Sequence, residues 1–373
     1  MEEEIKMKLV SSRDNLVEAI AIVQKAVSTR STLPILDGIL IEAGSSGVKL
    51  TGYDLETGIE ALVDAEVMEE GSIVIPSRIF GEIVRKLPED EVSISTNERM
   101  VIDIESGTSK FSINGISSEG FPKIPVVGDE NKIILNQDIL RNMILQTIFA
   151  ISNDEGRPGL NGSLFESDGQ NITIVSIDGY RMALRKEEIG SGIPVMKFLI
   201  PGKALHEAAR ILTGKEAEVT IYASSNHILF DTGRFRIVSR LINSEFMAYQ
   251  SIIPSNSSTT MVVDKDVVLN AVERASLIIQ KEDRRCPVSL SMTDEETLVI
   301  RSATELGNLR EDVKCQITGE LISVDFNHKY IMEALRSIED ERVKFMFSGA
   351  NGPSLIVPEE GNKYIYLILP LRK

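Results

Sequence analysis

Charged residues recur in three short segments of this 373-residue chain, each time at a spacing that places them on one face of a helix. The order is basic, acidic, basic at positions i, i+4 and i+7, in Arg78, Glu82 and Arg85, in Lys203, Glu207 and Arg210, and in Lys329, Glu333 and Arg336. Side chains at these intervals lie along the same side of an α-helix. A face of this kind can make weak, salt-screened contacts with the phosphate groups of a nucleic acid.

The charge balance limits how strong such contacts can be. The chain has a net charge of −16, but the six helices that the sequence predicts, over residues 12–28, 76–87, 136–151, 201–215, 264–281 and 327–338, together carry +5 and leave −21 for the rest. Nucleic acid would therefore be held weakly, and only at the helices. A single face of this kind is more typical of a solvated amphipathic helix. The same sign in all three charged helices favours the nucleic-acid interpretation.

Residues that could carry catalysis are scattered along the chain. His206, His227 and His328 are isolated, and Cys286 and Cys315 are not at zinc-binding spacing. The sequence also lacks a glycine-rich phosphate loop. We therefore predict a protein that is not an enzyme and needs no metal and no cofactor. Two alternatives stay open: an α+β enzyme built from scattered carboxylates, and a scaffold protein that assembles through edge strands without DNA.

The charged helices belong to a larger pattern that repeats roughly every 125 residues. A longer helix with one apolar stripe precedes each of them, and short alternating β runs fill the intervals. Each third of the chain has the order helix, strands, helix, strands, which predicts an α+β domain with two helices packed on an antiparallel sheet. We place the domains at residues 1–128, 129–256 and 257–373.

Composition predicts a cytoplasmic protein without a membrane segment. Apolar residues make up 42% of the chain, which suffices for packed cores, but no apolar run approaches the ~20 residues of a membrane span. Residues 1–6 are acidic and lack the features of a signal peptide. Two cysteines cannot form a disulfide framework, which indicates a reducing compartment.

Several segments resemble the bacterial DNA polymerase III beta subunit, the beta sliding clamp family. They are residues 32–36 (TLPIL), 160–166 (LNGSLFE), 178–183 (DGYRMA) and 366–372 (YLILPLR). The match extends from about residue 7 to residue 373, and residues 1–6 look like an extension. The resemblance implies three repeated domains of the DNA-clamp type, each an antiparallel sheet with two helices, that form a six-domain ring as a homodimer.

The function implied by the resemblance is topological. The ring would encircle double-stranded DNA and tether the replicative polymerase, which confers processivity without catalysis. The implied partners are the DNA polymerase III alpha subunit, the clamp loader, and other clamp-binding polymerases and repair proteins. High affinity for DNA would hinder sliding, so a mildly basic lining suits this role.

The resemblance also implies a groove that binds short, mostly extended peptides of partner proteins through leucine and phenylalanine anchors. Its residues would be Leu160, Ile177, Gly179, Tyr180, Arg181, Met182, Met247, Ser251, Ile252, Tyr330, Leu367, Ile368, Leu369, Pro370, Leu371 and Arg372. Three depart from the family pattern: Tyr180 replaces a histidine, Met247 a proline and Ser251 an arginine. We expect a softer, less positive groove. Plain core packing stays an alternative for Ile177 and Leu367.

Two further sets of residues follow from the resemblance. The residues expected to contact DNA are Arg30, Arg78, Arg85, Arg157, Lys203 and Arg210. For ring closure, Phe111 and Ile113 on an edge strand of the first domain would meet Ile278 and Ile279 in the third domain of a second copy. Exposed apolar residues on a strand edge are otherwise an aggregation hazard, which favours an interface.

Overall fold

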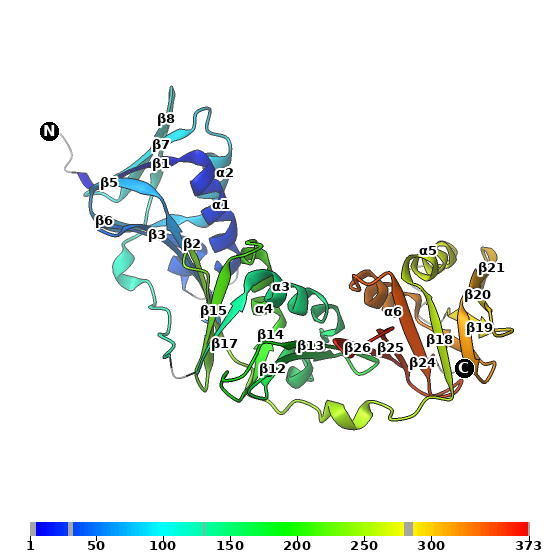
Figure 1. The fold of residues 1–373 in the computed structure, drawn as a ribbon. Coiled ribbons are helices and arrows are strands. Elements are labelled where there is room, and N and C mark those ends of the chain that lie inside the picture. The colour runs from blue at the N-terminus through cyan, green and yellow to red at the C-terminus, as the bar shows by residue number, and fades with distance from the viewer. Residues whose placement is uncertain (1–4, 29–32, 130, 280–285, 372–373) are drawn as a thin grey trace. The chain divides into compact units, whose positions relative to one another are not determined.

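The computed structural model describes residues 5–28, 33–129, 131–279 and 286–371. The chain divides into two compact units: Met1–Leu140 with Lys203–Leu241, and Arg141–Gly202 with Ile242–Lys373. The predicted order of elements is confirmed, because helices and antiparallel strands alternate in three successive repeats (Figure 1). The division between the units falls inside the predicted middle domain, so the predicted domain limits stay a prediction from the repeat.

The first repeat contains helices α1 (Arg13–Val23) and α2 (Ser77–Arg85), which pack against each other. Its strands are β1 (Ile5–Ser12), β2 (Gly38–Gly44), β3 (Gly47–Tyr53), β4 (Thr57–Val63), β5 (Ala65–Glu69), β6 (Gly71–Pro76), β7 (Glu91–Asn97), β8 (Val101–Ser106) and β9 (Ser109–Asn114). The Ser12 hydroxyl caps α1 by accepting a hydrogen bond from the Asn15 N–H at 3.2 Å. The helix ends at Val23, earlier than predicted, because a 3₁₀ turn follows at Gln24–Ala26.

The second repeat contains α3 (Gln137–Leu145) and α4 (Gly202–Ile211). Its strands are β10 (Asn131–Asn136), β11 (Gly162–Ser167), β12 (Asn171–Ile177), β13 (Arg181–Glu188), β14 (Met196–Pro201), β15 (Glu218–Ala223), β16 (His227–Asp231) and β17 (Phe235–Arg240). Both helices are shorter than predicted, and α3 gives way to a 3₁₀ turn at Ile148–Ala150.

The third repeat contains α5 (Lys265–Ser276) and α6 (His328–Arg336), which also pack together. Its strands are β18 (Thr259–Asp264), β19 (Val288–Met292), β20 (Thr297–Thr304), β21 (Gly307–Lys314), β22 (Gln316–Gly319), β23 (Ser323–Phe326), β24 (Arg342–Phe347), β25 (Ser354–Pro358) and β26 (Tyr364–Ile368). Asp264 caps α5 by accepting from the Val267 N–H at 3.0 Å, and Asn327 caps α6 by accepting from the Lys329 N–H at 3.0 Å.

Each unit contains one large sheet that runs across two successive repeats. In the first unit the order is β10-β15-β16-β17-β4-β3-β2-β6, and the pair β17–β4 joins the second repeat to the first. In the second unit the order is β14-β11-β12-β13-β26-β25-β24-β18-β22, and the pair β13–β26 joins the second repeat to the third. A smaller sheet accompanies each of them, β5-β1-β7-β8-β9 in the first unit and β21-β20-β19-β23 in the second.

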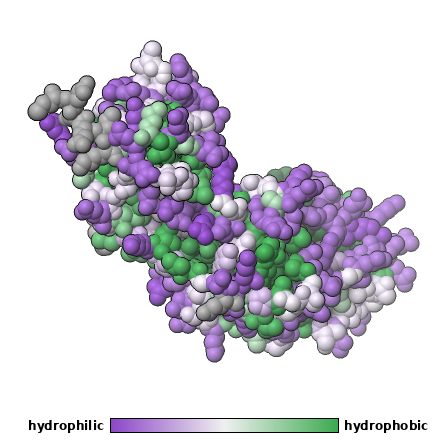
Figure 2. All heavy atoms as spheres, turned by 60° about the vertical axis from the view of Figure 1, so that its left-hand side comes forward, coloured by the Kyte–Doolittle hydropathy of each residue, from purple (hydrophilic) through white to green (hydrophobic). Residues whose placement is uncertain are grey.

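Hydrophilic residues cover most of the face shown in Figure 2, and apolar residues gather in limited patches on it. Within the described part of the chain, no helix is both long and apolar enough to cross a membrane.

Candidate functional site

An apolar cluster covers one face of the nine-stranded sheet where β13 pairs with β26. Side chains alternate between the two faces of a strand, so Met182 and Leu184 of β13 share this face with Leu367, which lies opposite Met182. The buried members of the cluster are Leu160, Leu164, Val175, Ile177, Met182, Leu184, Tyr249, Leu355 and Leu367. Partly buried residues pack against them: Phe246, Ile252, Ile253, Met346, Val357 and Ile365. We call this surface the β13–β26 face.

Exposed apolar side chains adjoin this buried floor. Tyr180 is 61% exposed, Met247 is 45% exposed and Leu369 is 39% exposed. The Leu369 N–H donates to the Tyr180 carbonyl oxygen at 2.9 Å, and the Leu371 N–H donates to the Asp325 carbonyl oxygen at 2.8 Å, so the C-terminal segment is held in place. A buried apolar floor edged by exposed apolar side chains suits the binding of apolar side chains from another chain.

The turn before β13 sets the outward position of Tyr180. The Asp178 carboxylate accepts hydrogen bonds from the Tyr180 N–H at 2.8 Å and the Arg181 N–H at 3.0 Å. Gly179 has a φ of 95°, a conformation that glycine adopts without steric cost. The sequence Asp-Gly-Tyr-Arg therefore folds as a side-chain-capped turn that leaves the tyrosine ring in solvent.

The Arg181 side chain lies away from the β13–β26 face. It is 9% exposed and forms ion pairs with Asp178 at 2.9 Å and with Glu333. Its guanidinium group also lies 5.3 Å from the centre of the Phe149 ring and 4.5 Å from that of Tyr330. These contacts satisfy the cation inside the second unit, so Arg181 and Tyr330 stabilise the fold there rather than line the predicted groove.

Ile368 is also separated from the groove that we predicted. It follows Leu367 on β26, and strand alternation turns its side chain into the large core of the third repeat. Of the other predicted groove residues, Leu160, Ile177, Met182 and Leu367 belong to the β13–β26 face and Ile252 packs against it. Ser251 is exposed, and Pro370 and Leu371 are partly buried. Arg372 lies outside the described residues.

The floor includes residues that sequence reasoning missed. Val175, Leu184 and Leu355 are all buried in the cluster, and none was among the predicted groove residues. The alternation of apolar side chains along β13, at Met182 and Leu184, was a signal that could have indicated one of them. Tyr249 was missed because a tyrosine in a connecting segment carries no periodic signal.

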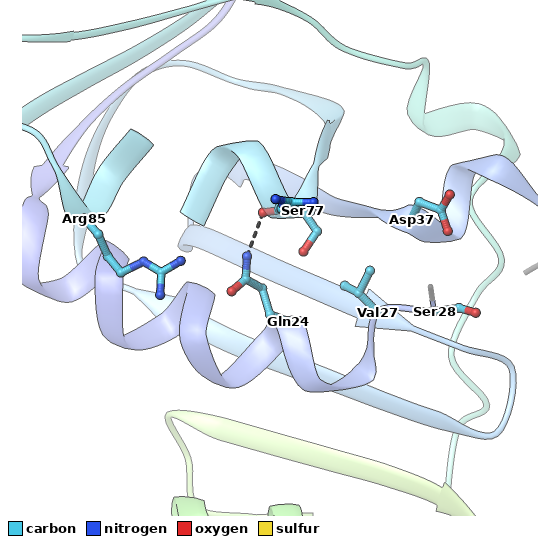
Figure 3. Close-up of a pocket in the computed structure, with 7 residues that line it drawn as sticks. Gln24, Val27, Ser28, Asp37, Ser77 and Arg85 are labelled. Carbon is cyan, nitrogen blue, oxygen red and sulfur yellow. Dashed lines mark hydrogen bonds between the residues drawn. The ribbon is translucent and has the colours of Figure 1, made fainter. Parts of the chain in front are cut away.

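The predicted basic face of α2 exists, but its cations are partly neutralised. The Arg78 Nε donates to Glu82 at 3.0 Å and its side chain is 92% exposed. The Arg85 Nε donates to the Gly81 carbonyl oxygen at 2.8 Å. A cavity of about 420 Å³ lies beside the helix. Its lining consists of Gln24, Val27, Ser28, Asp37, Ser77, Arg78 and Arg85 (Figure 3). The Asp37 carboxylate in this lining weakens any preference for anions.

Three further predicted DNA contacts, Arg210, Lys203 and Arg157, are paired with carboxylates. Arg210 lies 2.9 Å from Glu207. Lys203 forms an ion pair with Asp54 within the first unit. Arg157 forms an ion pair with Asp154 at 2.8 Å in the second unit, and Arg30 lies outside the described residues. These surfaces can contact phosphate only weakly, because each cation already has an anionic partner. Among the described residues, no group of histidine, cysteine, aspartate and glutamate side chains could hold a metal ion.

Exposed apolar side chains lie on one sheet edge, at β9, and directly after helix α5. Phe111, 40% exposed, and the partly buried Ile113 lie on β9 at the edge of the five-stranded sheet. Ile278 is partly exposed after α5, but Ile279 is 8% exposed and belongs to the core of its own unit. Leu277, 80% exposed, is the more accessible apolar side chain there, and the expected contact between copies stays a prediction.

Family models of the DNA polymerase III beta subunit match nearly the whole chain. The N-terminal domain model matches residues 7–125, the central domain model 134–247 and the C-terminal domain model 250–372. The chain belongs to the beta sliding clamp family. It is similar to the beta sliding clamps of Halalkalibacterium halodurans, at 34% identity, and Bacillus subtilis, at 35%. Each alignment covers 98% of this chain and 100% of the relative.

The solved structures agree with the family models. The crystal structure of the DNA polymerase sliding clamp from Bacillus subtilis matches with a TM-score of 0.94 at 34% identity, over 99% of this chain and 100% of that one. The predicted family, the α+β fold of three repeated clamp domains and the role of a replication processivity factor are confirmed. Members of this family do not catalyse a reaction themselves, so the alternative of an α+β enzyme is set aside.

Proposed function

We propose that two copies of this sliding clamp close head to tail into a ring of six domains around double-stranded DNA. The β13–β26 face is then the groove that binds peptides of the DNA polymerase III alpha subunit, the clamp loader, and other polymerases and repair proteins. The observation that supports the groove is its buried apolar floor, edged by Tyr180, Met247 and Leu369. The place of action is the cytoplasm, where bacterial DNA is replicated.

Ring closure is supported by two unpaired sheet edges. β9 ends the five-stranded sheet of the first unit, and β21 ends the four-stranded sheet of the second. Unpaired strand edges with apolar side chains are natural sites for pairing with another chain. Leu277 and Ile278 of one copy would meet Phe111 and Ile113 of the next, which buries all four side chains.

The expected contacts with DNA are weak, because the basic side chains already interact with other groups of the protein. Arg78, Arg85, Lys203 and Arg210 lie on α2 and α4, and each of them already donates to an oxygen atom within the protein. A phosphate group must therefore displace or share these interactions. Such a surface lets the ring slide, and the contacts weaken further as the salt concentration rises.

Truncation of the C-terminus tests the groove. Deletion of residues 369–373 removes Leu369 and the hydrogen bond to Asp325, so a fluorescent peptide with one leucine and one phenylalanine anchor should no longer bind. The dimer should persist, because β9 and β21 are untouched. A matched variant that lacks only Lys373, which is not among the predicted groove residues, should keep the peptide affinity. Unchanged affinity after the longer deletion would show that the groove lies elsewhere.

A further inference from the structure

The connector between the second and third repeats forms one side of the β13–β26 face. Phe246, Tyr249, Ile252 and Ile253 pack on the apolar cluster. The backbone hydrogen bonds of residues 243–255 are local, such as the Tyr249 N–H to the Met247 carbonyl oxygen at 2.7 Å. Among the described residues, none of them joins this stretch to a strand. The exposed groove residues Met247 and Ser251 therefore depend on side chains for their position.

One side chain supplies a directed bond. Tyr249 is 6% exposed, and its hydroxyl donates a hydrogen bond to the Glu166 carboxylate on β11. Burial and this hydrogen bond together raise the pKa of Tyr249 far above its usual value, so the hydroxyl keeps its proton and stays a donor. Glu166 lies two residues after Leu164 on the same strand, hence on the face that carries the cluster.

The first repeat shows that the fold does not require this bond. There Glu42 of β2 lies opposite Lys49 of β3, just as Glu166 of β11 lies opposite Thr173 of β12. Glu42 forms an ion pair with that lysine at 2.9 Å. On the β12 side, threonine takes the place of that lysine. Lys197 of β14 also lies opposite Glu166, but among the described residues it forms no ion pair with Glu166, and the carboxylate accepts from Tyr249 instead.

The two connectors between repeats also differ at the position that Tyr249 occupies in the second connector. The first connector has Ile124 three residues after Phe121, where the second has Tyr249 three residues after Phe246. Ile124 has no hydroxyl group and packs against Gly58 instead. The tyrosine and the available carboxylate therefore occur together, in the repeat whose sheet face carries the apolar cluster.

We propose that the Tyr249–Glu166 hydrogen bond holds the connector in the position that completes the groove, which makes Tyr249 a positioning residue for peptide binding. This inference rests on the proposed function of the β13–β26 face. Loss of the bond frees the 3₁₀ turn Tyr249–Ile252, and the side chains of Met247 and Ser251 then lose their fixed place beside the floor. The bound peptide should dissociate faster, with a smaller change in its association rate.

Conservative substitutions in the full-length dimer test the bond. Tyr249→Phe should weaken binding of the labelled leucine–phenylalanine peptide about tenfold, because a hydrogen bond to a charged acceptor is lost. Glu166→Leu should weaken it to a similar extent. Glu166→Gln keeps an oxygen that accepts from the tyrosine and should bind nearly as the wild type does. Tyr222→Phe, in the first unit, is the control for loss of a tyrosine hydroxyl and should change nothing.

The double variant Tyr249→Phe with Glu166→Leu separates a direct bond from independent effects. If the two groups act through one bond, the double variant should bind no more weakly than either single variant. Amide exchange should rise in residues 246–253 of Tyr249→Phe and stay unchanged in the strands of the second unit.

Three results would overturn the proposal. They are unchanged peptide affinity in Tyr249→Phe, equal losses in Glu166→Gln and Glu166→Leu, and additive losses in the double variant. A different failure, absence of peptide binding by the wild-type dimer, would refute the proposed groove itself.

Discussion

The two units contain corresponding strand junctions with opposite surface chemistry: β4 pairs with β17 in the first, and β13 pairs with β26 in the second. Asp54 and Asp178 occupy the same place in the turns that precede β4 and β13. Each carboxylate accepts hydrogen bonds from the backbone N–H groups two and three residues later. Counting from these turns, Glu60 in the first unit corresponds to Leu184 in the second.

In the first unit a row of ion pairs crosses the junction. Lys49 contacts Glu42 at 2.9 Å and Glu60 at 3.2 Å, and Arg236 contacts Asp231 at 2.9 Å and Glu60 at 4.0 Å. Partial burial lowers the pKa of Lys49, but its hydrogen bonds and charge interactions with the two glutamates outweigh this effect and raise the pKa above its usual value. We call these five residues the ion-pair row.

In the second unit the positions that correspond to Glu60 and Arg236 are apolar. Leu184 lies opposite Ile365 on β26, where the first unit has Glu60 opposite Arg236. Aliphatic side chains there can bury the apolar surface of a bound peptide. At the first junction, binding a peptide would remove water from the charged groups and separate the ion pairs, which costs free energy. The clamp fold therefore supplies the same strand junction twice, and we propose that a few side chains decide which of the two junctions binds a peptide.

The largest expected effect separates ring closure from the groove. Phe111→Asp with Leu277→Asp places charges at both apolar surfaces and should convert the dimer to monomers in sedimentation at micromolar concentration. The peptide affinity of the monomer should equal that of the dimer, because the β13–β26 face lies within one unit. If the substituted protein stays dimeric, ring closure uses other edges. Phe111→Leu with Leu277→Ile is the matched control.

Exchange of side chains between the two junctions tests the comparison itself. Leu184→Glu with Ile365→Arg copies the corresponding pair of the ion-pair row into the groove. Peptide binding should weaken by about a hundredfold or more, since two apolar contacts are lost. The reverse exchange in the first unit, Glu60→Leu with Arg236→Ile, should leave binding at the groove unchanged. Full peptide affinity in the first variant would show that these side chains do not decide where peptides bind.

The smallest expected effect is the dependence of folding stability on pH. Each unit contains one partly buried histidine whose pKa is lowered. Burial lowers the pKa of His227 in the first unit, helped by Arg240, and burial lowers that of His328 in the second, helped by Lys329. A base whose pKa is lower in the folded state takes up a proton on unfolding. The folded state therefore loses stability as the pH falls below about 6.5, the usual value for histidine.

Thermal unfolding between pH 7.5 and pH 5.5 measures this loss. His227→Gln and His328→Gln should each reduce the drop in melting temperature relative to the wild type, and the exposed His206→Gln should not. An equal drop in all four proteins would contradict the assignment.

The repeat and its chemistry could be predicted from the sequence because they depend on local periodicity. The spacing of Arg78, Glu82 and Arg85 predicted a charged helix face, and α2 carries it. The extent of helices was less predictable: residues 24–28 have helical spacing, but a 3₁₀ turn ends α1 there. The family resemblance covered nearly the whole chain, and the family was confirmed by a matching model in each third of it.

The site was harder to predict, because it depends on which face of a strand each residue occupies. Ile368 and Leu367 are neighbours in sequence but belong to different clusters, and only the register of β26 separates them. Leu355 could not be predicted for the same reason. It lies opposite Leu367 in the β25–β26 pair, and no motif marks its strand. Partners across large sequence separations, such as Glu333 for Arg181, leave no local pattern.

We propose that the clamp holds DNA by encircling it rather than by affinity, and circular DNA tests this directly. The protein should be loaded onto a nicked circular plasmid by its clamp loader with ATP, the complex isolated, and the DNA then cut once. The account predicts that the protein stays on the circle and leaves the linear molecule. Retention on the cut DNA, or failure to associate with the circle despite an active loader, would contradict encirclement.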